Sequence, residues 1–517
     1  MATIRIMQIP TQTGTYTGTN TFDECLPSNY WPIAPVTVRI DEDLSSYFKV
    51  KYILRIYKNS VSASNLLSTL KQRTNNNSST TNQIAIFDIR GIVNTQLQFT
   101  NRDSNATTFE IHTIGKNVTS KIFSKNNGTI KTIVVVATWE FSTSASNPPV
   151  EQTGDTTTMT MYFSPATFSL FQVVNEDINP LNKYFINSAT LSFALSNLHK
   201  EQDIREKNKF LTVSILQGAI NYVSARYCYH TIGFLNKSGW GSDGQYIALK
   251  YYDKTGTQTG STYTIQNDTT QGGTLPASAA SDDAYMIFAG VGTKNLTHYQ
   301  GACFKDNVAL ANFDGQPNNI TDWAYYSIQL VNDQSGSGGK SNLYYFVKDN
   351  SLSEHTDILG NTYIVNCQQQ PVIRLGWINQ LGAWDYYNFR GGFVETLKSE
   401  RMDYTTIIGA SELNDGDVYT FDTWSRGKSV LKTNTTATAR IESQFMSEQQ
   451  AKLLEPLFSS PSVMIIDNGL ITTTFEGASQ PVIVTNKSFE RKTKSKNRIE
   501  IKYTFEIEYA SKLNTIE

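Results

Sequence analysis

Residues 371–393, PVIRLGWINQLGAWDYYNFRGGF, limit the fold of this chain more than any other stretch. The aromatic side chains in it are Trp377, Trp384, Tyr386, Tyr387, Phe389 and Phe393. Aromatic residues favour strands, where they pack across neighbouring backbones. We predict that Trp377 and Trp384 are buried and serve packing rather than ligand stacking. The stretch has no catalytic pattern, so Trp377, Trp384, Tyr386, Tyr387 and Phe389 are candidate structural or interface residues.

The order of residues in this stretch predicts a β-hairpin. Residues 372–378 alternate like a strand, with every second side chain apolar. Residues 379–382 read as the loop, in which Gly382 can take the positive φ that such loops require. Residues 383–389 are then expected to return as the second strand. Cross-strand aromatic pairs would make this hairpin a rigid platform.

The same alternation appears near both ends of the chain. Residues 47–57 are typical of a half-buried antiparallel strand. The side chains predicted for its apolar face are Phe48, Val50, Tyr52, Leu54 and Ile56. Residues 499–509 alternate without interruption, which predicts one strand of roughly 35 Å. Because Thr, Ser and Asn are also abundant, the chain favours strands joined by polar loops.

The 517 residues are enough for three to four domains at ~150 residues each. We predict a mainly β protein, with several antiparallel sandwich- or barrel-like domains and a few short helices. Residues 1–187 are assigned to an N-terminal β domain with an extended arm, and residues 188–321 to a middle β domain. Residues 322–440 form an aromatic-rich hairpin domain, and residues 441–517 a C-terminal α+β module.

Two short helices are expected. Asp88 can cap the first, and Ser447 with Gln450 forms a capping box for the second. The apolar stripes are Ile89, Ile92, Val93 and Leu97 in the first helix, and Ala451, Leu454 and Phe458 in the second. Pro456 is expected to kink the second helix or to end it early, because proline lacks a backbone donor.

Residues 11–21, TQTGTYTGTNT, are too polar to enter a core. We predict an extended arm that becomes ordered only against a neighbour, with Thr11 and Thr21 as interface candidates.

No catalytic, cofactor or metal pattern is found. The five histidines lie in unrelated contexts, and the four cysteines form no CxxC pair. Gly339-Lys340-Ser341 ends like a phosphate-binding loop, but Gln334 stands where that loop needs its first glycine. We therefore predict no enzyme, no cofactor and no metal. A hydrolase such as a glycosidase stays open as a lesser alternative, because paired carboxylates can come from anywhere in a fold.

Charge and hydropathy limit the partners. Lys plus Arg number 44 against 46 Asp plus Glu, so the net charge of -2 lacks the basic excess of a nucleic-acid binder. No run approaches the ~18 apolar residues of a membrane span, and the N-terminus lacks a signal peptide. We expect no specific nucleic-acid binding and no membrane contact.

Three segments resemble one family of proteins. Residues 374–389 are similar to the pattern R-L-x-W-L-N-x-L-G-G-W-D-Y-Y-x-F, with Ala383 where the pattern prefers glycine. Residues 447–461 look like the S-E-x-x-A-x-x-L…S-P helix that follows it, although Pro456 departs from it. Residues 481–510 resemble the C-terminal strands of the same proteins. These are virion proteins of tailed bacteriophages, notably crAss-like and other phages of Bacteroidetes hosts.

The resemblance is fair over about residues 320–517, looser before residue 100 and absent between. It implies a multi-copy structural protein, a tail or collar ring or a hub, and transfers no catalytic residue. The implied partners are the chain itself in a cyclic homo-oligomer and other tail, portal or collar proteins. The implied location is the tail or neck of the virion, with assembly in the bacterial host cytoplasm. The alternative is a receptor- or carbohydrate-binding tail-fibre module, which a trimeric spike rather than a ring would favour.

Overall fold

The structure is a computed structural model. It describes residues 4–8, 21–30, 36–41, 43–73, 83–97, 112, 123–126, 130–168, 220–223, 229–237, 246–266, 284–297, 323–331, 333, 335–339, 343–348, 353–356, 362–365, 372–378, 383–406, 410–411, 419–420, 427–445, 448–466, 479–486, 488–490 and 501–510. Over these residues the fold is mainly β with a few short helices, as predicted, and its sheets are mostly antiparallel. None of the sheets in the described ranges closes into a barrel.

Two sheets build the N-terminal part. One contains β1 (Ile4–Gln8), β3 (Val36–Ile40) and β6 (Ile84–Phe87). The other runs β2 (Thr21–Tyr30), β10 (Thr157–Phe168), β8 (Lys131–Ser142), β4 (Phe48–Lys58) and β5 (Leu66–Arg73), with β9 (Val150–Glu151) paired to β8. Side chains from both sheets and from α1 (Arg90–Gln96) share one hydrophobic core. The single-turn helices η1 (Leu44–Ser46) and η2 (Ala63–Asn65) flank β4.

The predicted strand over residues 47–57 needs one correction. Tyr52, Leu54 and Ile56 of β4 lie in the core as expected, but Phe48 is 45% exposed. Lys49 has a φ of 56°, and the register to β8 shifts between Phe48 and Lys51. This bulge breaks the alternation, so the pattern holds only after it.

Two sheets form the middle of the molecule. One has the order β11 (Ile220–Val223), β17 (Tyr344–Lys348), β16 (Tyr325–Val331), β13 (Tyr246–Tyr252) and β14 (Gln258–Gln266). The other has the order β12 (Thr231–Lys237), β15 (Ala284–Gly290) and β7 (Phe123–Asn126). The short helix α5 (Thr293–Thr297) follows β15, and β18 (Ser353–Thr356) pairs with β19 (Thr362–Val365).

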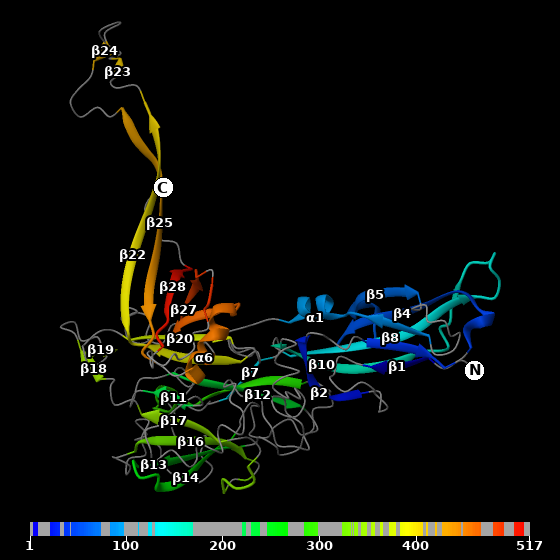
Figure 1. Cartoon of the computed structure of the whole chain (residues 1–517), viewed down its shortest axis with the longest axis horizontal. Coiled ribbons are helices and arrows are strands. Elements are labelled where there is room, and N and C mark those ends of the chain that lie inside the picture. Colours follow the sequence, from blue (N-terminus) through cyan, green and yellow to red (C-terminus); the bar gives the residue numbers. More distant parts are fainter. Residues whose placement is uncertain are drawn as a thin grey trace, which may run out of the picture.

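A seven-stranded sheet forms the C-terminal part. Its order is β21 (Trp384–Phe389), β20 (Ile373–Ile378), β26 (Val463–Ile466), β27 (Gln480–Val484), β28 (Thr504–Tyr509), β25 (Lys428–Glu442) and β22 (Gly392–Thr405). The helix α6 (Glu448–Ser459) packs on it through Leu454 and Leu457. β22 and β25 rise well away from the rest of the molecule, with the small pair β23 (Ala410–Ser411) and β24 (Tyr419–Thr420) at their far end (Figure 1).

The sheets do not follow the domain boundaries predicted from the sequence. β7 pairs with β15 across the boundary at 187/188, and β16 pairs with β13 across that at 321/322. β25 pairs with β28 across the boundary at 440/441. Strand pairing joins segments that are far apart in the sequence, and a pass along the chain does not detect it.

Two further C-terminal predictions are corrected. Of residues 501–509, the described part of the strand predicted over 499–509, only Thr504–Tyr509 form a strand, β28. The hydroxyl of Ser443 accepts a hydrogen bond from the Tyr503 backbone N–H at 2.9 Å, in place of a ladder partner. α6 continues to Ser459 despite Pro456, and Leu457 rather than Phe458 is fully buried beside Leu454.

Several sequence predictions fall outside the described residues. They are the loop at 379–382, the cap residue Ser447 and most of the polar N-terminal segment at 11–21, including Thr11.

Candidate assembly site

The paired strands β22 and β25 form a projecting ribbon, here called the arm. Its register runs from Gly392 opposite Glu442 to Thr405 opposite Lys428, with one shift beside Met402. From Val394 to Thr405 every residue of β22 is exposed. A strand this long with no covered face is unusual in a single subunit, because two-stranded ribbons are marginally stable in water.

The base of the arm is anchored in the C-terminal core. Ile441 and Ala439 of β25 are buried there together with Phe505 and Ile507 of β28. Just before β22, the N–H of Gly391 donates to the Glu442 carbonyl at 2.9 Å. A Cβ at Gly391 would lie 2.4 Å from the Ser443 carbonyl oxygen, so this approach requires glycine. The arm therefore leaves the sheet at a fixed point.

Beyond its base the arm exposes apolar side chains. The large hydrophobic side chains that are exposed on it are Val394, Leu397, Met402, Tyr404, Val430 and Leu431. Elsewhere in the described residues, the exposed large hydrophobic side chains are Phe48, Val61, Leu66, Ile86, Val150, Phe445 and Ile483. These seven are spread over several elements, whereas the six of the arm lie on one ribbon. Concentrated exposed apolar surface of this kind marks interaction sites.

The hairpin formed by β20 and β21 is the opposite case. Its first strand is buried along its whole length. One face, with Ile373, Leu375 and Trp377, belongs to the C-terminal core. The other face meets β12 and the segment before it, through a cluster of buried polar residues that we call the junction.

Arg374 is the centre of the junction. Its side chain is 3% exposed and donates to the Asn388 side-chain oxygen at 2.7 Å and to the Tyr229 carbonyl at 2.9 Å. It also contacts Nδ1 of His230 at 3.0 Å. A guanidinium group can only donate, so Nδ1 of His230 accepts and this ring is neutral, with its proton on Nε2. Burial, together with the charge of Arg374, holds the pKa of His230 well below its usual value.

Tyr386 closes the junction from the neighbouring strand. The guanidinium carbon of Arg374 lies over its ring, 5.1 Å from the ring centroid. Its hydroxyl lies 2.5 Å from the Thr231 hydroxyl and 2.8 Å from Nδ1 of His112. Gly376 faces Tyr386 across the pair of strands, and a Cβ there would lie 3.0 Å from the tyrosine ring. The glycine in the sequence RLGW thus leaves space for this ring.

His112 brings a distant segment into the same cluster. Its ring packs edge-on against Trp384 at 4.3 Å, and its carbonyl accepts from the Asn295 side chain at 3.0 Å. Asn295 in turn accepts from the His230 backbone N–H at 2.8 Å. Burial lowers the pKa of His112 to about 3, and the charge of Arg374 adds to the effect. The junction therefore ties four separate parts of the chain together with both imidazoles uncharged.

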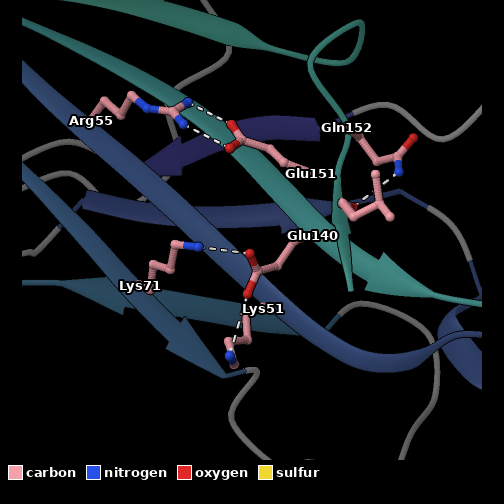
Figure 2. Close-up of polar contacts among 7 residues, drawn as sticks. Lys51, Arg55, Lys71, Glu140, Glu151 and Gln152 are labelled. Carbon is pink, nitrogen blue, oxygen red and sulfur yellow. Dashed lines mark hydrogen bonds and ion pairs between the residues drawn. The ribbon is translucent and has the colours of Figure 1, made fainter. Parts of the chain in front are cut away.

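The N-terminal sheet carries a cluster of charged side chains. Glu151 binds Arg55 through both oxygens at 2.6 and 2.7 Å, and Glu140 binds Lys71 at 2.7 Å and Lys51 at 3.3 Å (Figure 2). Burial alone would raise the pKa of Glu140, but the hydrogen bonds from the two lysines outweigh it and the pKa is lowered. An acid catalyst needs the reverse shift. These ion pairs stabilise the sheet.

The residues singled out from the sequence are placed as follows. Trp377 and Trp384 are buried, as predicted, and Phe389 is buried beside Phe505. Tyr386 is in the junction, and Tyr387 is partly buried against the C-terminal core. These five side chains therefore work inside the subunit. Thr21 opens β2, opposite Thr160 of β10.

Sequence reasoning missed both the arm and the junction. Residues 392–405 and 428–436 show no apolar alternation, and that lack is the sign of a strand exposed on both faces. The glycine within RLGW was the one local sign of a close packing partner.

Searches against protein-family models and against curated proteins give no match. No helix among the described residues is long and apolar enough to cross a membrane. Within the same residues no group of three or more His, Cys, Asp or Glu side chains is placed to hold a metal ion.

Proposed function

We propose that this chain is a multi-copy structural component of a tailed-phage virion, a tail or collar ring or a hub, acting through assembly contacts. The observation that carries the proposal is the arm: a long ribbon, exposed on both faces and fixed at its base by Ile441 and Gly391. Ordering such a ribbon costs conformational entropy, and the exposed ribbon contributes little to the stability of its own subunit. Its use lies in contact with other chains.

The rest of the subunit supports the same function. The junction and the hydrophobic cores of the N-terminal and C-terminal parts make the subunit rigid outside the arm. A subunit that is repeated around a ring must keep its shape between its neighbours. The resemblance of residues 374–389 to a virion protein pattern points in the same direction. The partners proposed are further copies of the chain and other tail, portal or collar proteins, in the tail or neck of the particle.

The carbohydrate-binding alternative has less support. It predicts exposed Trp and Tyr side chains as stacking platforms for sugars or receptor loops. Trp377 and Trp384 are 0% and 1% exposed, and the exposed Tyr404 lies on the arm.

The test is the state of the purified full-length chain and its place in the particle. Light scattering coupled to size exclusion should give a discrete oligomer larger than a trimer, and negative-stain images should show a ring. A reconstruction of the virion should show several copies around the tail axis. A trimeric spike at the fibre tip would overturn the proposal in favour of the receptor-binding alternative. Turnover of a polysaccharide by the isolated chain would also overturn it.

A further inference from the structure

Among the described residues, both strands of the arm have an edge without a strand partner, along the same part of the arm. β22 is the last strand of its sheet, and within the described residues no strand pairs with its outer edge. The other edge of the arm belongs to β25, which β28 covers only from Thr438 to Glu442. The segments left open are residues 397–405 of β22 and residues 428–437 of β25. Each spans roughly 30 Å at about 3.3 Å per residue.

On both edges, every second residue directs its backbone N–H and C=O groups away from the arm. The Thr406 N–H donates to the Gly427 carbonyl at 2.8 Å, so these residues form a hydrogen-bonded pair of the arm. Antiparallel pairs alternate between bonded and non-bonded. Thr405 and Asp403 on β22, with Lys428 and Val430 opposite them, therefore turn their N–H and C=O groups away from the arm. Both edges present donors and acceptors to a further strand.

The composition of the two strands is compatible with strand pairing. Neither β22 nor β25 contains proline, and β25 has threonine at 433, 435, 436 and 438, a residue with high strand propensity. An exposed edge of this kind templates the addition of a strand. The only irregularity is the extra residue Leu431, where the register shifts.

From these observations we infer that the arms of neighbouring copies pair edge to edge, β25 of one copy with β22 of the next. This inference depends on the cyclic assembly proposed above and names the surface that forms it. In a ring all arms point the same way, so the strands alternate in direction around it. Each contact between β25 and the next β22 is then antiparallel, and the last arm closes on the first.

Charge disfavours the pairing of two β25 edges. The open part of β25 carries Lys428 and Lys432 and no acidic residue, and Lys428 is ion-paired with Asp403 of its own arm at 2.7 Å. Two such edges side by side would bring the Lys432 side chains together. In the open part of β22, Glu400 and Asp403 balance Lys398 and Arg401, so this edge is neutral. Basic β25 against the neutral β22 of the next copy avoids the repulsion between lysines.

The face of the ribbon limits the register. Val394, Glu400 and Met402 share one face with Lys432 and Asn434. A continuous sheet keeps its faces, so the register between copies can change only in steps of two residues. Side chains of this face on one copy must meet side chains of the same face on the next.

Single cysteine variants test the inference directly. Glu400→Cys is mixed in turn with Lys432→Cys, Asn434→Cys and Thr436→Cys, and each mixture is oxidised. We expect one of the three mixtures to give a disulfide dimer, since the bond needs Cα atoms within about 7 Å. Equivalent residues of neighbouring copies lie two strands apart, at roughly 9.5 Å, so no single variant should cross-link alone. The unsubstituted chain controls for the four native cysteines.

Each other outcome contradicts the inference in a different way. A dimer from Glu400→Cys alone would show that β22 edges pair with each other. A dimer from Asn434→Cys alone would show the same for β25. If all mixtures fail while the unsubstituted chain still forms its ring, the arm is not the contact and the proposed function stands. If the unsubstituted chain forms no oligomer in solution or in the particle, the proposed function itself fails.

Shortening the arm gives an independent measurement. Residues 398–436 are replaced by Asn-Gly, which joins Leu397 and Ala437, an opposed pair, through a tight turn. The buried base residues stay in place, so the body should keep its melting temperature within a few degrees. We expect the ring population to fall at least tenfold at equal concentration. A shortened chain that forms rings normally but fails to enter the particle would instead assign the arm to another virion protein.

Discussion

Two strand pairs of the same seven-stranded sheet, β20–β21 and the arm, differ in how far their faces are buried. In β20–β21 both faces are covered, and segments around residues 112, 229–231 and 295 join it in the junction. In the arm both faces are open, and every residue of β22 from Val394 to Thr405 is exposed. One hairpin holds the subunit together, and the other gives it a surface to share.

The comparison separates two uses of long β structure. Aromatic residues in β20–β21 are anchored by neighbours, so their burial stabilises the monomer. Apolar residues of the arm remain in water, and their burial can stabilise only an assembly. Substitutions in the two hairpins should therefore affect different measurements.

The largest effect is expected for Trp384→Ala. The indole is 1% exposed and packs on His112, so its removal leaves a cavity at the junction. The expected loss of unfolding free energy is about 3–5 kcal/mol, measured by chemical denaturation at a concentration where the chain is monomeric. Leu397→Ala on the arm is the matched control, with a change within about 0.5 kcal/mol. Equal losses in both variants would remove the distinction between the hairpins.

The next effect comes from acid. His112 and His230 are neutral in the fold, with pKa values held below the unfolded value near 6.5. Their contribution to stability is complete above pH 6.5 and is lost as the pH falls toward the folded pKa, about 3 for His112. Between pH 7 and pH 5 protonation of unfolded-state His112 should cost about 2 kcal/mol of unfolding free energy, and His230 should add to this loss. Protonation of His230 would also oppose the hydrogen bond from Arg374.

The measurement is unfolding free energy against pH. Replacing His112 by Gln should reduce the slope between pH 6.5 and 5, even if the variant is less stable at pH 7. An unchanged slope would show that His112 is not a neutral member of the junction.

The sequence predicts β20–β21 well and the arm not at all, for one physical reason. Alternation in a sequence reports which side chains are buried, and it does so wherever a strand has one covered face. β20 is buried on both faces and is recognised by its apolar and aromatic residues, whereas β22 has no pattern because neither face is covered. The same rule explains the overlong strand predicted over 499–509. Ile501 and Tyr503 are buried like strand residues, although the ladder begins only at Thr504.

The sequence did not predict the junction, for a different reason. Trp384 and Tyr386 were identified from their local sequence, but their partners His112, Thr231 and Asn295 come from distant segments. Single histidines and asparagines occur throughout a chain of this size, and nothing in their neighbourhood marks a buried partner. Such clusters appear only when strand pairing is known.

A smaller effect is expected for Tyr386→Phe. The change keeps the ring and removes the hydroxyl between Thr231 and His112, which leaves both buried groups without this partner. A cost of about 1–3 kcal/mol in unfolding free energy follows. The control is Tyr404→Phe on the arm, where the hydroxyl is in water and the change should stay within about 0.5 kcal/mol. A loss at Tyr404 as large as that at Tyr386 would mean that the arm folds back on its own subunit.

The smallest effect on the monomer sharpens the comparison most. Leu431 is the extra residue at the shift of register and is 68% exposed, so Leu431→Ser removes little that is packed. We expect the unfolding free energy of the monomer to change by less than about 0.5 kcal/mol. Ring formation should weaken, because an apolar side chain beside the proposed contact becomes polar. Sedimentation across a concentration series separates the two quantities. Trp384→Ala should show the reverse, with a large loss of monomer stability and rings that re-form wherever the body is folded. If Leu431→Ser instead destabilises the monomer and leaves the rings unchanged, the arm belongs to the core of its own subunit, and the two hairpins differ only in length.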